Sequence, residues 1–317
     1  MILITGAGGF IGSNILTYFS KLNKKIVIID DFANKKKWDF IKQDSFLKYY
    51  QISDLKSALE LDFSLVIHMG AITNTIEDDD KKLNYYNIEY SKKIWNYCVE
   101  KNIPLIYASS AATYGDGSNG FSDNHKAIKK LNPLNKYGHS KHKFDLWCLK
   151  QTKFPSYWYG LKFFNVYGMN ENNKGNMASV VHWGTEFIYE NNYINLFKSN
   201  NKKIKDGNQK RDFIFCNDII NVIRFLIQRK VKSGIYNIGT GEARTFQSLA
   251  INIFKNLQIQ TDIRYVDMPK KLINKYQNFT EADTKKIRKA GFDNFTSLED
   301  GIRLYVNNFI NPKKIKT

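Results

Sequence analysis

The chain opens with MILITGAGGFIG, residues 1–12, and this stretch decides the fold. A short apolar run comes first, glycines follow at positions 6, 9 and 12, and an amphipathic segment begins at Ser13. This order predicts a buried strand, a tight turn and the N-terminus of a helix. Gly6 permits the turn, Gly9 lets the backbone approach a pyrophosphate, and Gly12 lets helix and strand pack closely. The free N–H groups and the dipole of such a helix end favour that anion.

A second apolar run, residues 26–29, ends in Asp30. This acid lies about 20 residues beyond the glycines, where a carboxylate accepts hydrogen bonds from the adenosine ribose of a dinucleotide. Three consecutive lysines follow at 35–37, and Lys37 is a candidate to hold the 2′-phosphate of NADP. Asp31 is a second acid that would repel such a phosphate. We therefore expect NADP and leave NAD open as the alternative cofactor.

The first half of the chain alternates between strand and helix patterns. Apolar runs at 46–52, 65–68 and 104–108 alternate with helical patterns at 13–22, 83–101 and 137–152. We therefore predict an α/β fold, a Rossmann-type doubly wound parallel sheet with a smaller α/β substrate-binding C-terminal lobe. Residues 1–165 are expected to form the dinucleotide-binding domain, to which a helix at 215–230 and a strand at 234–238 return. Residues 166–317 are expected to form mainly the substrate-binding lobe.

Tyr137 and Lys141 stand one helical turn apart in YGHSK, residues 137–141, and follow ASSAATYG, residues 108–115. A phenol titrates near ~10, and a neighbouring lysine cation favours the phenolate. Ser110 is placed to orient an alcohol whose proton is removed. These three groups are suited to hydride transfer between a secondary alcohol and a nicotinamide. We interpret His68, at the end of a predicted strand, as a packing residue, and expect Asn87 to hold a buried loop or a water near the cofactor.

Composition and sequence patterns argue against several other classes of protein. The net charge is +18, but only seven of the 48 basic residues are arginine and none precedes Arg211, so we expect no nucleic-acid partner. No apolar run approaches the length of a membrane span, and no signal peptide precedes the first strand, so we expect neither a membrane partner nor export. The three cysteines lack metal-ligand spacing, and we expect reduced thiols and no metal site.

The glycine triplet, Ser110, Tyr137 and Lys141 resemble the extended short-chain dehydrogenase/reductase superfamily in its nucleotide-sugar branch. Further blocks narrow the resemblance to the ADP-heptose 6-epimerase family: FNVYG at 164–168, KGNMASV at 174–180, KRDF at 210–213 and KYQNFTEAD at 275–283. This resemblance implies a cytoplasmic, NADP-dependent isomerase that inverts C6″ of ADP-heptose for the inner core of lipopolysaccharide. It also implies a homo-oligomer, and the family suggests a pentamer.

The resemblance assigns roles to particular residues. Catalysis is expected from Ser110, Tyr137, Lys141 and Lys174, with Lys174 as a second proton-transfer group. Cofactor contacts are expected from Gly6, Gly9, Phe10, Ile11, Gly12, Asp30, Asp31, Lys37, Met69, Gly70, Ala71, Asn87, Tyr137, Lys141, Val166 and Lys174. Substrate contacts are expected from Ser110, Asn165, Asn176, Phe197, Lys198, Ser199, Arg211 and Tyr276. His182 receives no role, and the lysine-rich segment 200–209 is longer than expected in the family.

Related enzymes with other reactions are distinguished from this chain by residues at particular positions. A 4,6-dehydratase needs an Asp-Glu pair directly after the catalytic hydroxyl, and this chain has Ala111 and Ala112 there. A hexose 4-epimerase or a reductase keeps Ser110, Tyr137 and Lys141, and either one stays open as an alternative. A 4-epimerase does not need Lys174, so this lysine discriminates between the two epimerases. A non-enzymatic NADP-binding regulator is disfavoured by the intact Ser-Tyr-Lys set.

Overall fold

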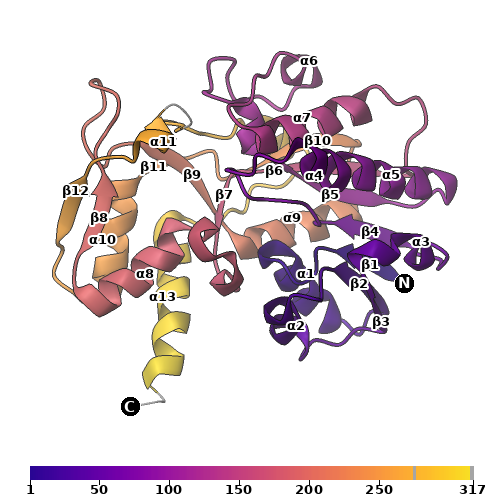
Figure 1. Ribbon diagram of the computed structural model, residues 1–317, viewed down its shortest axis with the longest axis horizontal. Helices are drawn as coiled ribbons and strands as arrows, with labels where there is room; N and C mark the ends of the chain where they lie inside the picture. Colours follow the sequence, from indigo (N-terminus) through magenta and orange to yellow (C-terminus); the bar gives the residue numbers. More distant parts are fainter. Residues whose placement is uncertain (274–275, 315–317) are drawn as a thin grey trace.

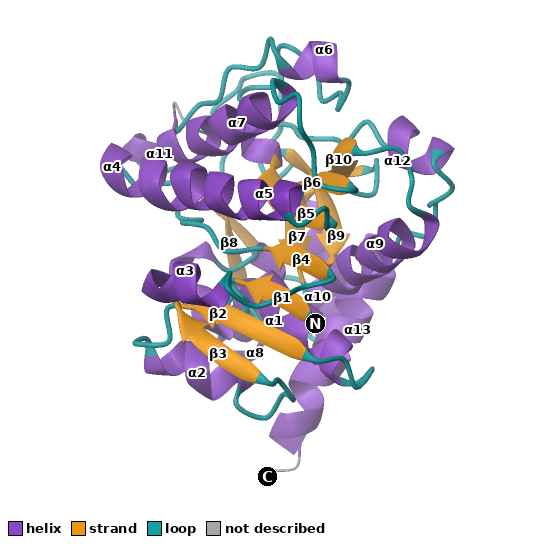
Figure 2. Cartoon of the chain, turned by 90° about the vertical axis from the view of Figure 1, so that its right-hand side faces the viewer, coloured by secondary structure: helices purple, strands orange, loops and turns teal. Residues whose placement is uncertain are grey.

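The computed structural model describes residues 1–273 and 276–314, without the side chains of Asn173, Asn176, Lys271 and residues 311–314. Its main sheet has the strand order β10-β6-β5-β4-β1-β2-β3, and Figure 2 shows these strands following one another from β3 at the bottom to β10 near the top. The strands are β1 (Ile2–Thr5), β2 (Ile26–Asp30), β3 (Lys48–Gln51), β4 (Leu65–His68), β5 (Leu105–Ser110), β6 (Trp158–Phe163) and β10 (Gly234–Ile238).

Every pairing within this sheet is parallel, so the carboxyl ends of its strands meet at one edge. The chain leaves β1 for β2 and β3 on one side and then crosses to β4 on the other side of β1. Such a reversal of direction is the point at which doubly wound sheets bind ligands. Thr5, Asp30, His68 and Ser110 end four of the strands at this edge.

Helices cover both faces of the sheet because its strands are apolar on both sides. One face packs against α1 (Phe10–Ser20), α2 (Lys35–Ile41), α9 (Cys216–Arg229) and α12 (Lys285–Lys289). The other face packs against α3 (Leu55–Ala58), α5 (Tyr90–Glu100) and α7 (Lys136–Leu149). Short segments connect these elements: α4 (Asp80–Leu83), α6 (His125–Ile128) and the 3₁₀ turns Ile52–Asp54 and Ala111–Tyr114.

The helix predicted over 83–101 is interrupted in the structure. A π-helical turn, Asn84–Glu89, separates α4 from α5. The side chain of Asn87, in the middle of this turn, is fully buried. Periodicity did not reveal this turn because a π turn shifts the helical register by a single residue.

The remaining elements form a smaller lobe, on the left in Figure 1. It holds a three-stranded sheet of β11 (Ala243–Thr245), β9 (Lys210–Phe215) and β7 (Asn165–Tyr167), and a two-stranded sheet of β12 (Ile263–Val266) and β8 (Ile194–Phe197). The helices α8 (Val180–Asn191), α10 (Phe246–Leu257), α11 (Lys270–Ile273) and α13 (Leu298–Lys314) and the 3₁₀ segment Asn172–Met177 complete it. The structure thus confirms the predicted α/β fold with its smaller C-terminal lobe. Within the described ranges, no helix is long and apolar enough to cross a membrane.

Candidate active site

The glycine turn has the shape that a pyrophosphate requires. Gly6 has a φ of +71°, and a Cβ there would come within 2.5 Å of the Gly70 nitrogen. A Cβ on Gly12 would overlap the carbonyl oxygen of Gly6. Helix α1 begins after Gly9, and within the described chain no side chain caps it and no acid occupies its first turn. Its positive end is therefore free to bind an anion, which fits a dinucleotide phosphate.

Asp30 is held in place from two sides. Its Oδ2 accepts a hydrogen bond of 2.8 Å from the Gly8 N–H. Its Oδ1 lies 2.5 Å from the Lys37 ammonium, whose side chain is 30% exposed. Asp31 points into solvent. The structure therefore places Lys37 beside Asp30, the position expected for the adenosine ribose.

The segment after β4 is fixed by buried polar groups. The Gly70 N–H donates to Thr5 Oγ1 at 3.2 Å, while Asn87 bonds both the N–H and the carbonyl of Ile72, at 2.8 and 3.0 Å. Asn87 also donates to Ser140 Oγ at 2.8 Å, which ties this segment to α7. Asn87 thus holds a loop, as expected. Met69, Gly70 and Ala71 lie in that loop.

His68 has the packing role expected of it. Its two ring nitrogens lie 2.6 Å from Thr5 Oγ1 and 2.8 Å from Ser91 Oγ. Burial lowers the pKa of His68 to about 3, so the ring is neutral near pH 7. A neutral ring with both nitrogens engaged stabilises the end of β4 and leaves no nitrogen for catalysis.

Ser110 ends β5, and Tyr137 and Lys141 lie one helical turn apart on α7. Tyr137 and Lys141 lie on one buried face of α7, and the Ser110 hydroxyl hydrogen-bonds the Tyr137 phenol. Ser110 Oγ also accepts a bond of 3.1 Å from the Ala112 N–H. Burial lowers the pKa of Lys141 to about 8, against an opposing effect of the Asp145 carboxylate. The structure thus brings Ser110 and Tyr137 together, and it places Lys141 on the same buried side of α7 as Tyr137.

The charge state of Tyr137 differs from our expectation. We expected the lysine cation to favour the phenolate, but burial raises the pKa of Tyr137, and the Ser110 hydrogen bond offsets this only in part. Lys141 is itself buried, so its own charge is disfavoured and it cannot fully offset the burial of a phenolate. The phenol therefore carries its proton at neutral pH.

A buried ion pair lies next to this site, and no sequence pattern predicted it. Lys162 Nζ lies 2.5 Å from Asp145 Oδ2, and both side chains are 0% exposed. Asp145 also accepts from Ser109 Oγ at 2.7 Å and from Tyr107 at 3.1 Å. Lys162 donates to Thr113 Oγ1 at 2.7 Å. The pair therefore joins β5, β6 and α7 next to the residues that flank Ser110.

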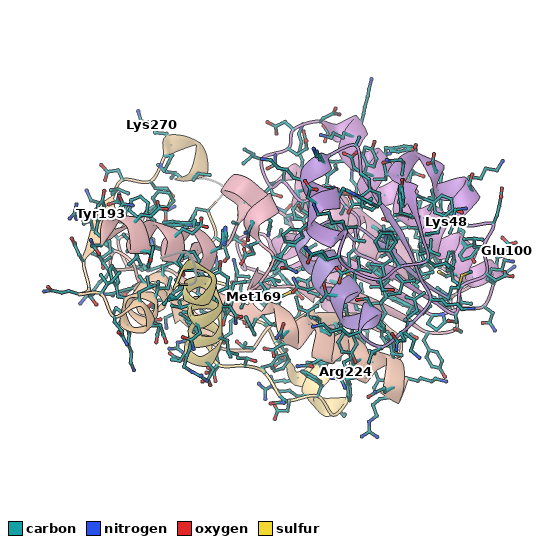
Figure 3. All side chains as sticks on the ribbon, turned by 90° about the horizontal axis from the view of Figure 1, so that it is seen from below. Lys48, Glu100, Met169, Tyr193, Arg224 and Lys270 are labelled. Atoms are coloured by element: carbon teal, nitrogen blue, oxygen red, sulfur yellow. The ribbon has the colours of Figure 1, made fainter. Side chains whose placement is uncertain are left out.

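Lys174 lies against the cofactor helix. Its ammonium is 5.1 Å from the centroid of the Phe10 ring, at the first residue of α1. Burial lowers the pKa of Lys174, opposed by the charge of Glu171. The loop is fastened to α1 by Asn14, which donates to the Met169 carbonyl at 2.9 Å, and Figure 3 shows Met169 between the two parts of the molecule. This lysine is thus a partly buried group beside the glycine turn.

Arg211 of β9 is a buried cation in the smaller lobe. Its guanidinium is buried and lies 4.9 Å from the Tyr276 ring centroid and 5.6 Å from that of Phe246. Burial lowers the pKa of Arg211. Among the described residues no carboxylate pairs with this guanidinium, which donates a hydrogen bond of 2.9 Å to the Lys210 carbonyl. A buried cation without a counter-ion is suited to an anionic ligand such as a diphosphate.

The other expected substrate residues are more dispersed. Asn165 Oδ1 accepts a bond of 3.4 Å from Thr280. Lys198 and Ser199 lie in an exposed loop that follows Phe197. The Lys198 ammonium pairs with Asp267 at 2.9 Å, and the Ser199 N–H donates to Asp206 at 2.7 Å. The Asn176 side chain and Lys275 lie outside the described residues, so their predicted surroundings stay untested. His182 Nδ1 lies 2.6 Å from Tyr305 Oη, which gives it a structural partner. The structure shows no cluster of metal-ligating side chains in its described part.

The protein has a Rossmann-type fold, a glycine-rich turn after β1, and a Ser-Tyr-Lys set on β5 and α7. This combination defines a nucleotide-dependent oxidoreductase or epimerase. Residues 2–239 match the model of the NAD dependent epimerase/dehydratase family, and the chain belongs to this family. It is 42% identical to the ADP-L-glycero-D-manno-heptose-6-epimerase of Fusobacterium nucleatum and 39% identical to that of Nitratidesulfovibrio vulgaris strain DP4, each over 98% of both chains. These similarities confirm the resemblance seen in the sequence blocks.

Solved structures of epimerases have the same fold as this chain. The ADP-L-glycero-D-manno-heptose-6-epimerase of Helicobacter pylori superposes with a TM-score of 0.83 and 26% identity, over 98% of this chain and 96% of that one. A UDP-N-acetylglucosamine 4-epimerase from Methanobrevibacter ruminantium has the same TM-score at 22% identity, over 98% of both chains. This second likeness shows a shared fold alone.

Proposed function

We propose that this protein converts ADP-D-glycero-β-D-manno-heptose to ADP-L-glycero-β-D-manno-heptose by inverting C6″, for synthesis of the lipopolysaccharide inner core. The proposal is supported by two candidate proton-transfer groups, Tyr137 beside Ser110 and Lys174 beside the glycine turn. Tyr137 interacts with Ser110 at the end of β5, and Lys174 lies against Phe10. The full-length similarity to 6-epimerases supports the same substrate.

The cofactor of this reaction is NADP in our proposal, with NAD as the alternative. A bound nicotinamide would supply the hydride acceptor and donor that inversion of C6″ through a ketone needs. The N-terminus of α1 would hold the pyrophosphate, and Asp30 would hold the adenosine ribose. Lys37, held 2.5 Å from Asp30 and still partly exposed, supplies the positive charge for a 2′-phosphate.

The chain itself moves the protons. Inversion requires rotation about C5″–C6″ between the two hydride transfers, so the C6″ oxygen occupies different positions before and after the rotation. Tyr137 Oη exchanges a proton with that oxygen in one orientation, and Ser110 Oγ orients it. Lys174 Nζ exchanges a proton in the other orientation. The lowered pKa of Lys174 eases the loss of its proton near neutral pH, as general base catalysis requires.

The smaller lobe holds the rest of the substrate in this proposal. Arg211 binds the diphosphate, Asn165 and Asn176 bond sugar hydroxyls, and Tyr276 packs beside the Arg211 guanidinium. The segment from Phe197 to Ser199 lies along the nucleotide. We also propose a division into residues 1–165 and 166–317, a cytoplasmic location, and a homo-oligomer whose expected form is a pentamer.

The test is to incubate the purified protein with ADP-D-glycero-β-D-manno-heptose and to follow C6″ by NMR. The proposal predicts an equilibrium mixture of the D-glycero and L-glycero forms. No change at C6″, together with inversion at ring C4 of a UDP-hexose, would favour a 4-epimerase instead. The nucleotide released by denaturation identifies the cofactor, and recovery of NAD alone would count against the 2′-phosphate role of Lys37.

A further inference from the structure

Glu171 is a fully buried carboxylate at the start of the loop that carries Lys174. Its side chain is 0% exposed. Its Oε1 accepts from the Gly168 N–H at 2.9 Å and from Ser179 Oγ at 2.8 Å, and its Oε2 accepts from the Ser179 N–H at 2.6 Å. Gly168 follows the last residue of β7, and Ser179 immediately precedes α8. One side chain therefore joins the two ends of the loop 168–179.

Lys174 is the charged residue at the centre of this loop. Its backbone N–H donates to the Glu171 carbonyl at 2.8 Å, and the next residue, Gly175, has a φ of +50°. Asn14 of α1 donates to the Met169 carbonyl at 2.9 Å. These bonds tie the loop to itself and to the cofactor helix. The Lys174 ammonium is thereby directed to the Phe10 ring, 5.1 Å from its centroid.

The effect of Glu171 differs from that of an ordinary buried acid. Asp218 of α9 is also buried, and it accepts from Thr296 N and Thr296 Oγ1, each at 2.8 Å. That carboxylate fixes the approach to α13. Glu171 makes the same kind of bonds, but the backbone that it fixes carries a group proposed to exchange a proton with substrate. Its position therefore has a catalytic consequence that Asp218 lacks.

We propose that Glu171 is a positioning residue for Lys174: its carboxylate closes the loop 168–179 and so sets the place of the Lys174 ammonium beside α1. This inference rests on the proposed function, because the place of Lys174 matters only if Lys174 exchanges a proton. Glu171 does not touch the Tyr137 side of the site among the described contacts. It should therefore govern the orientation of the ketone that Lys174 serves, and leave intact the orientation that Tyr137 serves.

The two orientations are separated by an aldehyde analogue of the substrate at C6″. Its hydrate loses a hydride and two protons to give a carboxylate, a second aldehyde gains the hydride and one proton to give an alcohol, and the other proton is released to solvent. This dismutation is balanced, needs no inversion, and is served by Tyr137 alone. Inversion of ADP-heptose requires both groups. The ratio of the two rates therefore reports on Lys174, and a general loss of folded protein lowers both rates alike.

The experiment compares Glu171→Gln and Glu171→Asp with Asp218→Asn as the matched control. A glutamine at 171 must turn its NH₂ toward one of the loop N–H groups, and an aspartate is too short to reach both ends. A buried donor left without an acceptor is expensive, so we expect inversion to fall at least about tenfold in Glu171→Gln. Dismutation should stay within about twofold of the unaltered protein, because Tyr137 serves it without Lys174. Glu171→Asp should show a smaller fall of inversion and the same near-normal rate of dismutation. Asp218→Asn should lower the thermal midpoint without changing the ratio of the two rates.

Two results would overturn the inference. One is inversion at a near-normal rate in Glu171→Gln, and the other is an equal fall of inversion and dismutation in both Glu171 variants. Lys174→Met, measured in parallel, distinguishes this failure from a failure of the proposed function. If Lys174→Met loses inversion while Glu171→Gln keeps it, Glu171 alone is wrongly assigned. If Lys174→Met itself inverts normally, the role of Lys174 and the inference built on it are both wrong.

Discussion

Removal of one member of the Asp145–Lys162 pair should destabilise the protein strongly. In Asp145→Asn, the Lys162 ammonium keeps its 2.7 Å bond to Thr113 but loses its counter-ion at 2.5 Å, at a place with 0% exposure. Breaking a buried pair by removing one partner costs about 3–5 kcal/mol, because the other charge is left buried and unpaired. Lys162→Met leaves the Asp145 carboxylate in the same situation, supported by Tyr107 and Ser109 alone.

The double variant Asp145→Asn/Lys162→Met should be less destabilised than the sum of the two single variants, because it leaves no buried charge. Urea denaturation followed by tryptophan fluorescence gives the free energy of unfolding for all four proteins. We expect a coupling of at least about 2 kcal/mol, within the range measured for groups in contact in one network. Single-variant losses that add to the double-variant loss within about 0.5 kcal/mol would refute the reasoning.

Three further predictions concern the site. Lys37→Glu should weaken binding of NADP more than binding of NAD, measured by titration of nucleotide-free protein; equal weakening of both would show that Lys37 does not contact a 2′-phosphate. Tyr137→Phe should lose nearly all turnover while it retains bound nucleotide. In Ser110→Ala the turnover rate should fall on the order of 10²-fold, as it does when one preorganised hydrogen-bond donor is removed. Ordinary turnover in Tyr137→Phe would contradict the assignment of the site. Lys141→Met should raise the thermal midpoint of nucleotide-free protein at pH 7, because the folded-state pKa of Lys141 is about 8, below the unfolded value near ~10.4. The destabilisation by the charged Lys141 is fully present below pH 8 and fades as the pH rises toward ~10. If the higher thermal midpoint of Lys141→Met did not shrink over this interval, a buried ammonium would be contradicted.

Local patterns predicted the parts of the site that depend on spacing along the chain. The glycines and Asp30 follow from the order of strand, turn and helix, and Tyr137 and Lys141 follow from one turn of helix. Strand β4 has the bounds predicted for it, and β3 is shorter than predicted because only Lys48–Gln51 pair with β2. These features are encoded within a few residues, so periodicity alone reveals them.

Features that depend on tertiary contacts were not visible in the sequence. Lys162 meets Asp145 because β6 pairs with β5 in the register that places it opposite Ser109. Glu171 meets Ser179 only when the loop between β7 and α8 closes. The expected stabilisation of the Tyr137 phenolate was wrong because burial raises the pKa of Tyr137, and the degree of burial is set by the folded structure.

The central claim is that Tyr137 and Lys174 serve opposite orientations of one ketone at C6″. The most direct measurement is the rate of C6″ inversion in Lys174→Met, followed by NMR on ADP-D-glycero-β-D-manno-heptose, beside the rate of dismutation of the C6″ aldehyde analogue. The claim predicts that inversion is lost while dismutation continues. Inversion at a near-normal rate in Lys174→Met would contradict it and would leave a mechanism in which Tyr137 alone moves the proton.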